Sequence, residues 1–511
     1  MQRITDNHAI EGAERAIREL LSVHGEWFFT QDGAAPLALG NNEFDFLIAH
    51  RRLIFSCWTE NGSRSWRITA WNWSGEKLLL EATRRMGADV ATLELVPRAS
   101  AKAIVRSIAA ARQFRCEKLA RIVCDRLPGA KIERAGLSPG MRRDQPGRYA
   151  RIILHQPHER ITVTATVAES DARNVDSLFS SALLWFNRVR QQAKRLFIEK
   201  LFMVVERDIL EAARQRHVLL TESLRRAIEL FEIDEAWEEL VPVLPLQRKD
   251  LWKKRLTRFP PVMETETSEE AMQIMARAPQ AIDVVTSRHG QTLRYHGLPF
   301  IRLRRVMDRD HIWFGIEGSR RRLLVEQAER DWHKLFRDLE IYRDENCRDP
   351  RQWLYRASGE AWLESILRRD ISRLDPGLIV APLHAQFRTS HGGPTGARPI
   401  DLLALRHDGR LVVIELKVSE DREHVFQGVD YWRRVEAHRR RGHITSAKLF
   451  GECQISNESP LVYLVAPTLR FHPSFRTLAK TIAPDIEIYR FDINEDWRAG
   501  VRVVRRERVN G

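Results

Sequence analysis

Two apolar segments joined by a short turn carry three charged residues in a stretch otherwise suited to a buried strand pair. The segments cover 399–405 and 411–418, and the charged residues are Asp401, Glu415 and Lys417. Successive side chains of a strand point to opposite faces, so Glu415 and Lys417 project from one face and their apolar neighbours from the other. A carboxylate and an ammonium group therefore stand side by side.

The turn between the two segments decides where Asp401 lies. A three-residue loop over 407–409, with Gly409 in the left-handed conformation, pairs Asp401 with Glu415. A two-residue loop would instead place Asp401 opposite Leu416, on the wrong face. We predict the three-residue loop, which brings two carboxylates together.

Paired carboxylates of this kind indicate a metal-dependent reaction. Two carboxylates held close together raise each other's pKa and attract a divalent cation. Hard oxygen ligands suit Mg²⁺ or Mn²⁺, which bind one or two carboxylates together with waters and substrate phosphate. The adjacent Lys417 would hold or help deprotonate a metal-bound water, or stabilise charge on a phosphate. These groups are typical of enzymes that hydrolyse phosphodiesters.

The same residues resemble the PD-(D/E)xK nuclease superfamily, in particular its RecB-like branch with a trailing Q-x-x-x-Y motif. Asp401 matches the first acid, 415–417 matches E-x-K, and Gln427 and Tyr431 match the last motif. The resemblance is strongest to the C-terminal domains of mismatch-cleaving and related DNA endonucleases. It covers about residues 351–500.

The superfamily also tends to carry a glutamate on the helix before the first core strand. Glu364 is the first candidate for this position and Glu360 the second. The alternative for Glu364 is a simple ion pair with Arg368, four residues further along the helix.

The resemblance implies an α/β fold with a restriction-endonuclease-like mixed sheet flanked by helices. It also implies that Asp401 and Glu415 bind Mg²⁺ or Mn²⁺ with help from Glu364, and that Lys417 positions the attacking water. Gln427 would orient the leaving side or a ligand water, and Tyr431 would meet the DNA backbone.

Basic residues continue along the helix that carries Gln427 and Tyr431. They are predicted to form a phosphate-binding ridge, and they are Arg433, Arg434, Arg439, Arg440 and Arg441. The whole chain has 83 basic and 69 acidic residues, a net charge of +14, which favours a polyanionic partner. DNA is the expected partner, and an RNA substrate is a third, weaker reading.

The rest of the chain is expected to divide into three further regions. Residues 1–170 read as an α+β domain with a β-meander over 43–97, residues 171–260 as a helical bridging segment, and 261–350 as a small α+β region. The nuclease-like domain then covers 351–511. Tryptophans 58, 66, 71 and 73 of the meander are either stacking platforms for bases or cross-strand core residues, and we favour the core.

A degenerate nuclease-like repeat is possible over 101–190. Superposing its predicted hairpin on the C-terminal one places Arg151 at Asp401, Ala165 at Glu415 and Val167 at Lys417. The alternative is chance similarity of two ordinary α/β segments, and we favour it.

Composition indicates the cellular compartment in which we expect the protein. Five scattered cysteines without a C-x-x-C pair favour a reducing cytoplasm, and the sequence lacks an apolar run long enough for a membrane span. A homodimer would supply the two active sites needed to cut both DNA strands. The rival function is a nucleic-acid-binding or assembly protein whose nuclease domain is vestigial.

Overall fold

The computed structural model describes most of the chain, and its parts fall into two compact units. The described residues are 1–511 except for 24–25, 32–36, 41–42, 60–61, 76, 85–88, 98–100, 141–146, 158, 169–174, 193–197, 235–236, 254–255, 260–266, 288–289, 307–308, 317–321 and 388–398. The first unit contains 1–178, 185–214 and 226–245, and the second contains 179–184, 215–225 and 246–511.

The first unit begins with an antiparallel sheet packed on helix α1 (Asn7–Ser22). Its strands are β1 (Gln2–Arg3), β2 (Glu26–Gln31), β3 (Leu37–Gly40), β4 (Phe44–Ala49), β5 (Arg52–Thr59), β6 (Gly62–Trp73), β7 (Leu78–Arg84) and β8 (Asp89–Pro97). The strand order β3-β2-β8-β7-β6-β5-β4, with β1 on β6, confirms the predicted meander over β4 to β8.

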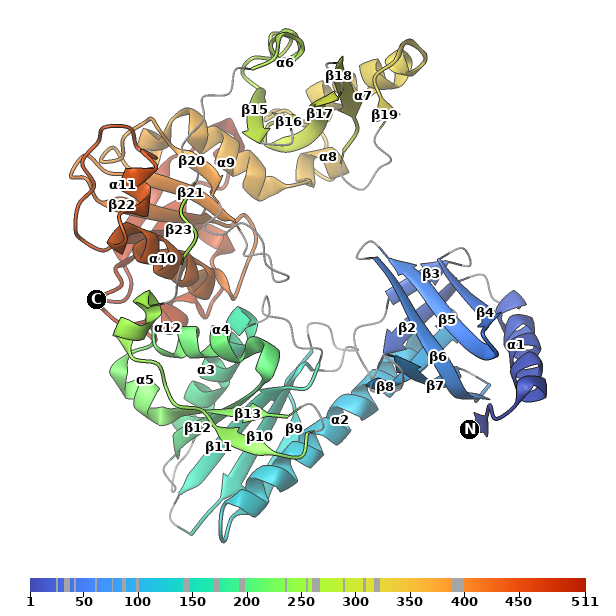
Figure 1. Ribbon diagram of the computed structural model, residues 1–511. Coiled ribbons are helices and arrows are strands. Elements are labelled where there is room, and N and C mark those ends of the chain that lie inside the picture. Colours follow the sequence, from blue (N-terminus) through green and yellow to red (C-terminus); the bar gives the residue numbers. More distant parts are fainter. Residues whose placement is uncertain are drawn as a thin grey trace. The chain divides into compact units, whose positions relative to one another are not determined.

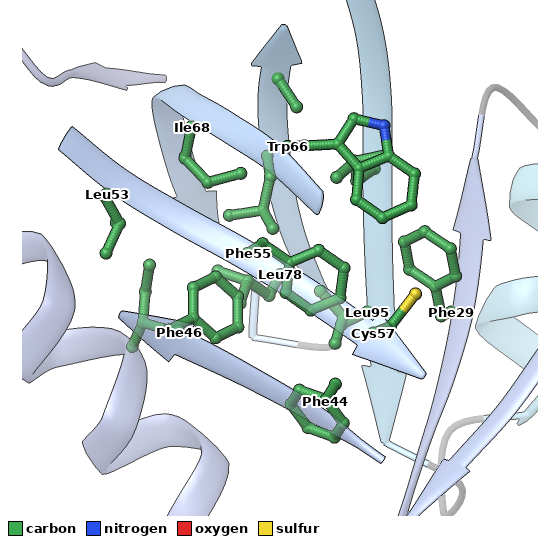
Figure 2. Close-up of a cluster of buried hydrophobic side chains, with 14 of the residues drawn as sticks. Phe29, Phe44, Phe46, Leu53, Phe55, Cys57, Trp66, Ile68, Leu78 and Leu95 are labelled. Carbon is green, nitrogen blue, oxygen red and sulfur yellow. The ribbon is translucent and has the colours of Figure 1, made fainter. Parts of the chain in front are cut away.

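Aromatic side chains fill the core of this sheet (Figure 2). Trp66 is 1% exposed and stacks on Phe55 with 5.8 Å between ring centroids. Trp71 and Trp73 are partly buried against the same core. The core interpretation is therefore confirmed for these three tryptophans, whereas the side chain of Trp58 lies outside the described part.

A six-stranded mixed sheet follows in the chain. Its elements are α2 (Ala101–Arg126), β9 (Lys131–Leu137), β10 (Tyr149–His155), β11 (Arg160–Thr166), α3 (Val175–Gln192), β12 (Ile198–Glu206), α4 (Arg207–His217), α5 (Glu222–Ala227), β13 (Ile228–Ile233) and β14 (Leu240–Pro242). The prediction of a helical segment over 171–260 is thus wrong. The apolar runs of β12 and β13 belong to parallel strands buried on both faces, and periodicity alone does not separate such runs from a buried helix.

The second unit contains a small antiparallel sheet, as expected for 261–350. It consists of α6 (Glu269–Met275), β15 (Ile282–Ser287), β16 (Gly290–Tyr295), β17 (Leu298–Val306), β18 (Arg309–Phe314), β19 (Arg322–Leu323) and α7 (Glu329–Tyr342), with the strands in sequence order.

The C-terminal part is a second six-stranded mixed sheet flanked by helices, which confirms the expected α/β class (Figure 1). Its elements are α8 (Trp353–Arg356), α9 (Gly359–Arg369), β20 (His384–Phe387), β21 (Ile400–Leu405), β22 (Leu411–Leu416), α10 (His424–Arg440), α11 (His443–Ser446), β23 (Leu461–Pro467), α12 (Phe475–Ala479), β24 (Ile488–Ile493) and β25 (Val503–Arg508). Strands β20 to β25 lie in sequence order. Among the residues that the structure describes, no helix is long and apolar enough to cross a membrane.

One buried arginine fastens the small sheet to the start of α9. The side chain of Arg343 is 0% exposed, and its guanidinium donates to the carbonyl oxygens of Tyr295, His296, Leu354, Ala357 and Ser358 at 2.7–3.4 Å. Gly297 continues the same contact, because a Cβ built on it would lie 1.9 Å from the carbonyl oxygen of Ala361. The turn between β16 and β17 therefore lies directly against the backbone of α9.

We expect Gly297→Ala to loosen this contact. Gly297 has φ +78° and Gly442 has φ +66°, but nothing lies within 4 Å of a Cβ built on Gly442. Both alanines carry the strain of a left-handed backbone, about 1–2 kcal/mol, and only Gly297→Ala adds a backbone clash. Chemical denaturation should show G297A to be less stable than G442A by about 1–3 kcal/mol. Equal losses would argue against the close approach.

Candidate active site

The turn between β21 and β22 has the predicted three-residue form. Gly409 donates to the carbonyl oxygen of Arg406 at 2.9 Å, and the Arg406 amide donates to the Arg410 carbonyl at 2.9 Å. Gly409 has φ +81°, and a Cβ there would lie 2.6 Å from the carbonyl oxygen of Gln454. A glycine is therefore required for both conformation and space.

The resulting register places Asp401 opposite Glu415. Leu402 pairs with Ile414, so the next pair along the hairpin is Asp401 with Glu415. Oδ2 of Asp401 accepts a hydrogen bond from the Leu416 amide at 2.8 Å, which fixes its carboxylate at the end of the strand pair. Burial, and then the charge of Glu415, raise the pKa of Asp401 well above its usual range.

Glu415 and Lys417 form a buried ion pair. Nζ of Lys417 lies 2.7 Å from Oε1 of Glu415, with side-chain exposures of 10% and 2%. Oε2 of Glu415 is buried and has no hydrogen-bond partner among the described residues. Burial raises the pKa of Glu415, although Lys417 opposes that shift.

Further carboxylates surround Lys417. Its Nζ lies 3.8 Å from Oε1 of Glu360 and 3.7 Å from Oδ2 of Asp421. Burial alone would lower the pKa of Lys417, but Glu415, Glu360 and Asp401 together raise it above its ordinary value. One ammonium group thus faces four carboxyl groups, and the surplus of negative charge suits a divalent cation.

The two glutamates of α9 have different partners from those expected. Oε1 of Glu364 pairs with Nη1 of Arg294 on β16 at 3.2 Å, whereas Arg368 pairs with Asp283. Glu360 is the α9 carboxylate that reaches Lys417. Helical spacing could not choose between them, because residues four apart share a face and the partner from β16 is distant in sequence.

Gln427 and Tyr431 lie on α10 and are 5% and 4% exposed. Burial, followed by the charge of Glu415, raises the pKa of the Tyr431 phenol. The Arg434 guanidinium lies 4.6 Å from the centre of the Tyr431 ring. This geometry favours a supporting role for Tyr431 next to the carboxylates over the expected contact with a DNA backbone.

Two acids on α10 neutralise much of the expected basic ridge. Asp430 lies 2.7 Å from Arg433, 3.0 Å from Arg434 and 2.6 Å from Arg216. Burial alone would raise the pKa of Asp430, but these three arginines lower it below its usual range. Asp430 belongs to a buried ionic cluster that the sequence analysis did not identify.

Glu436, six residues further along the helix, also pairs with arginines. It is 0% exposed and pairs with Arg439 at 2.7 Å and Arg440 at 2.6 Å, while Arg441 donates to the Ala437 carbonyl oxygen. The i,i+3 and i,i+4 spacing of these acids and arginines was the available signal. The geometry therefore speaks against a continuous phosphate-binding ridge, and Arg440, 48% exposed, retains the most access to solvent.

His424 supports the strand that carries Glu415. Its Nε2 lies 3.2 Å from the Glu415 carbonyl oxygen, and burial, together with Lys417, lowers its pKa to about 3. It is therefore neutral at physiological pH.

The carboxylates fit a two-ligand metal site. Within the described ranges, no group of three or more His, Cys, Asp or Glu side chains could hold a metal ion, so Glu364 does not complete a set with Asp401 and Glu415. Mg²⁺ and Mn²⁺ commonly use one or two carboxylates and keep several waters. The raised pKa of Asp401 and the unpartnered Oε2 of Glu415 match such a cation.

Comparisons with known proteins give weak similarity. No protein-family model matches the chain, and no curated protein matches it. Two solved structures are similar to part of it. The EndoMS-dsDNA2 complex shares 10% identity over 39% of this chain and 87% of that chain, with a TM-score of 0.14. A repair endonuclease from Pyrococcus abyssi shares 11% identity over 46% and 97%, with a TM-score of 0.13. Scores this low carry no argument, so the function rests on the site.

We expect Asp401→Asn to stabilise the metal-free protein more at pH 8 than at pH 5. The folded chain keeps a proton on Asp401 that the unfolded chain loses above about pH 4, so wild-type stability falls as pH rises through the folded pKa. Asparagine removes this titration and keeps an acceptor for the Leu416 amide. Thermal melts in EDTA should show a gain of about 2–4 °C for each kcal/mol. A larger gain at pH 5 would contradict the assignment.

Alanine substitution of the two α9 glutamates should lower the free energy of unfolding by different amounts. Glu364→Ala leaves Arg294 buried without this carboxylate and should cost about 3 kcal/mol. Glu360→Ala removes a side chain that is 43% exposed and should cost less than about 1 kcal/mol. Urea denaturation of both variants measures the difference, and a reversed order would refute the pairing of Glu364 with Arg294.

Proposed function

We propose that the chain is a metal-dependent endonuclease that hydrolyses phosphodiester bonds in DNA. The observation that carries the proposal is the geometry of the β21–β22 hairpin. Asp401 faces Glu415, Lys417 lies 2.7 Å from Glu415, and one buried oxygen of Glu415 has no hydrogen-bond partner in the described part of the chain. Burying this much charge lowers the stability of the folded protein. Binding of a cation and a phosphate would explain why these charges are present.

Asp401 and Glu415 would hold Mg²⁺ or Mn²⁺. When bound, such a cation polarises a phosphate oxygen and lowers the pKa of a coordinated water. In the metal-free protein, the surrounding carboxylates raise the pKa of Lys417 and keep its ammonium group charged, so Lys417 donates hydrogen bonds. This favours the second of its two expected roles, in which it stabilises the charge that develops on the phosphate.

The remaining residues keep this geometry fixed. Leu416 donates its amide to Asp401, His424 contacts the carbonyl of Glu415, and Tyr431 of α10 packs in the apolar cluster that contains Leu403 and Val413 of the same hairpin. The presence of all these side chains at one site argues against the rival reading of a vestigial nuclease domain.

Cleavage assays test the proposal directly. Lys417→Ala should lower Mg²⁺- or Mn²⁺-dependent cleavage of plasmid, nicked, branched and mismatched DNA by about 100-fold or more. Lys448→Ala is the matched control, because Lys448 is 69% exposed and pairs with Glu452 on the surface. Unchanged cleavage by K417A would refute the assignment, and cleavage confined to labelled RNA would change the substrate.

Metal binding should be measurable without turnover. Mn²⁺ should raise the melting temperature of the wild-type protein, because a ligand that binds only the folded state stabilises it by mass action. Asp401→Asn should lose most of this shift and K448A should keep it. Absence of a shift in the wild type, with no calorimetric binding of Mn²⁺, would favour the vestigial reading.

A further inference from the structure

The two six-stranded sheets of the chain have the same topology. In the first sheet, β9, β10 and β11 are antiparallel neighbours, β11, β12 and β13 are parallel, and β14 is antiparallel. In the second, β20 to β25 repeat this pattern strand by strand. Helices α3 and α10 occupy the same place in the order, between the hairpin and the next parallel strand (Figure 1).

The similarity extends to what precedes each sheet. An antiparallel meander and a long helix, α2, come before β9, and a smaller antiparallel meander and α7 to α9 come before β20. One two-part plan thus occurs twice along the chain, which a chance similarity of two short segments does not explain.

Core packing shows which face of the β10–β11 hairpin corresponds to which face of the β21–β22 hairpin. In the first sheet, Ile152 and Ala165 share a core with Leu119 of the preceding helix. In the second sheet, Leu402 and Leu416 share a core with the preceding helix α9. Residues on the opposite face therefore correspond, and Asp401 and Glu415 lie on that face.

The pairing register then assigns the equivalents. Arg151 pairs with Thr164, just as Asp401 faces Glu415, and Thr166 follows two residues later, in the place of Lys417. If Arg151 is kept at the place of Asp401, this register moves the other two equivalents from Ala165 and Val167 to Thr164 and Thr166. The reason is the turn between His155 and Arg160 in the first hairpin. It makes the spacing from Arg151 to Thr164 one residue shorter than the spacing from Asp401 to Glu415.

The helix equivalent to α10 supports this alignment. The Arg151 guanidinium lies 5.7 Å from the ring centre of Trp185 on α3. Trp185 holds the place of Tyr431, which lies near Asp401 and Glu415. An aromatic residue on the helix thus accompanies each hairpin pair.

The chemistry at the equivalent positions is nevertheless different. A guanidinium replaces the first carboxylate, and hydroxyl groups replace Glu415 and Lys417. Thr164 is 2% exposed, and its hydroxyl donates to the Ala150 carbonyl oxygen at 3.0 Å. Positions occupied by one cation and two hydroxyls cannot hold a divalent cation, because they supply no carboxylate ligand.

We infer that the chain is a fused pair of nuclease-like halves with a single catalytic centre, and that it cuts only one strand of duplex DNA. This inference rests on the proposed function of the Asp401 site. One hydrolytic event adds one water across one phosphorus–oxygen bond and leaves a phosphate and a hydroxyl at the break. A duplex cut through both strands needs this event twice, at two opposed positions, and of the two equivalent hairpins only the second carries the carboxylates.

Supercoiled circular DNA distinguishes the products. With the full chain in excess over plasmid and Mg²⁺ present, open circles should accumulate while linear DNA stays below about one-tenth of the product during the first turnover. Linear DNA that appears together with open circles would overturn the inference and leave the proposed function intact. No cleavage by the wild type would overturn the proposed function and, with it, this inference.

Matched variants locate the centre. Lys417→Ala should reduce nicking by about 100-fold or more, whereas Thr166→Val at the equivalent position should change it by less than about twofold, with melting curves confirming that both variants fold. Loss of nicking in folded T166V would show that the first half contributes to the chemistry and would overturn the inference.

Mixing wild-type protein with excess K417A tests for paired chains. The ratio of open circles to linear DNA should stay unchanged, because each chain acts alone. A shift from linear DNA to open circles on mixing would show that two chains combine their centres and would overturn single-strand cutting.

Discussion

Two carboxyl groups are held close together at the end of one strand pair of the C-terminal sheet, and the charged residues around them are arranged about this repulsion. Asp401 and Glu415 face each other because the β21–β22 turn has three residues, and burial intensifies their repulsion. Lys417 relieves part of it by pairing with Glu415. Glu360 and Asp421 bring more negative charge to the same ammonium group, so the site stays short of positive charge.

Helix α10 keeps this unfavourable arrangement in place. Asp430 and Glu436 each pair with two arginines of the same helix, and the guanidinium of Arg434 lies over the ring of Tyr431. Gly428 lets the helix approach β23, because a Cβ on it would lie 2.5 Å from the side chain of Leu464. The arginines of α10 therefore pair with acids inside the protein, although their number alone would suggest contact with nucleic acid.

The sequence was informative wherever a local rule fixed the geometry. The Gly409 turn, the facing of Asp401 and Glu415, and the meander of the first sheet all follow from strand alternation and turn length. Sequence reasoning failed where long-range contacts decided. Arg294 pairs with Glu364 from a strand 70 residues away, and β12 is a strand whose two neighbours are both parallel. In the first hairpin, Arg151 pairs with Thr164, whereas the spacing in the sequence had suggested Ala165.

The second compact unit is assembled from three separate stretches of chain, 179–184, 215–225 and 246–511. Arg216 completes the charge balance of Asp430, and the Thr221 amide donates to the Thr481 carbonyl oxygen at 2.8 Å. A fragment that begins at residue 246 or later would lack both. Such a fragment would keep Asp401, Glu415 and Lys417 but would lose part of its own interior, so the stretches 179–184 and 215–225 belong to the structural unit of the site although they lie outside it in sequence.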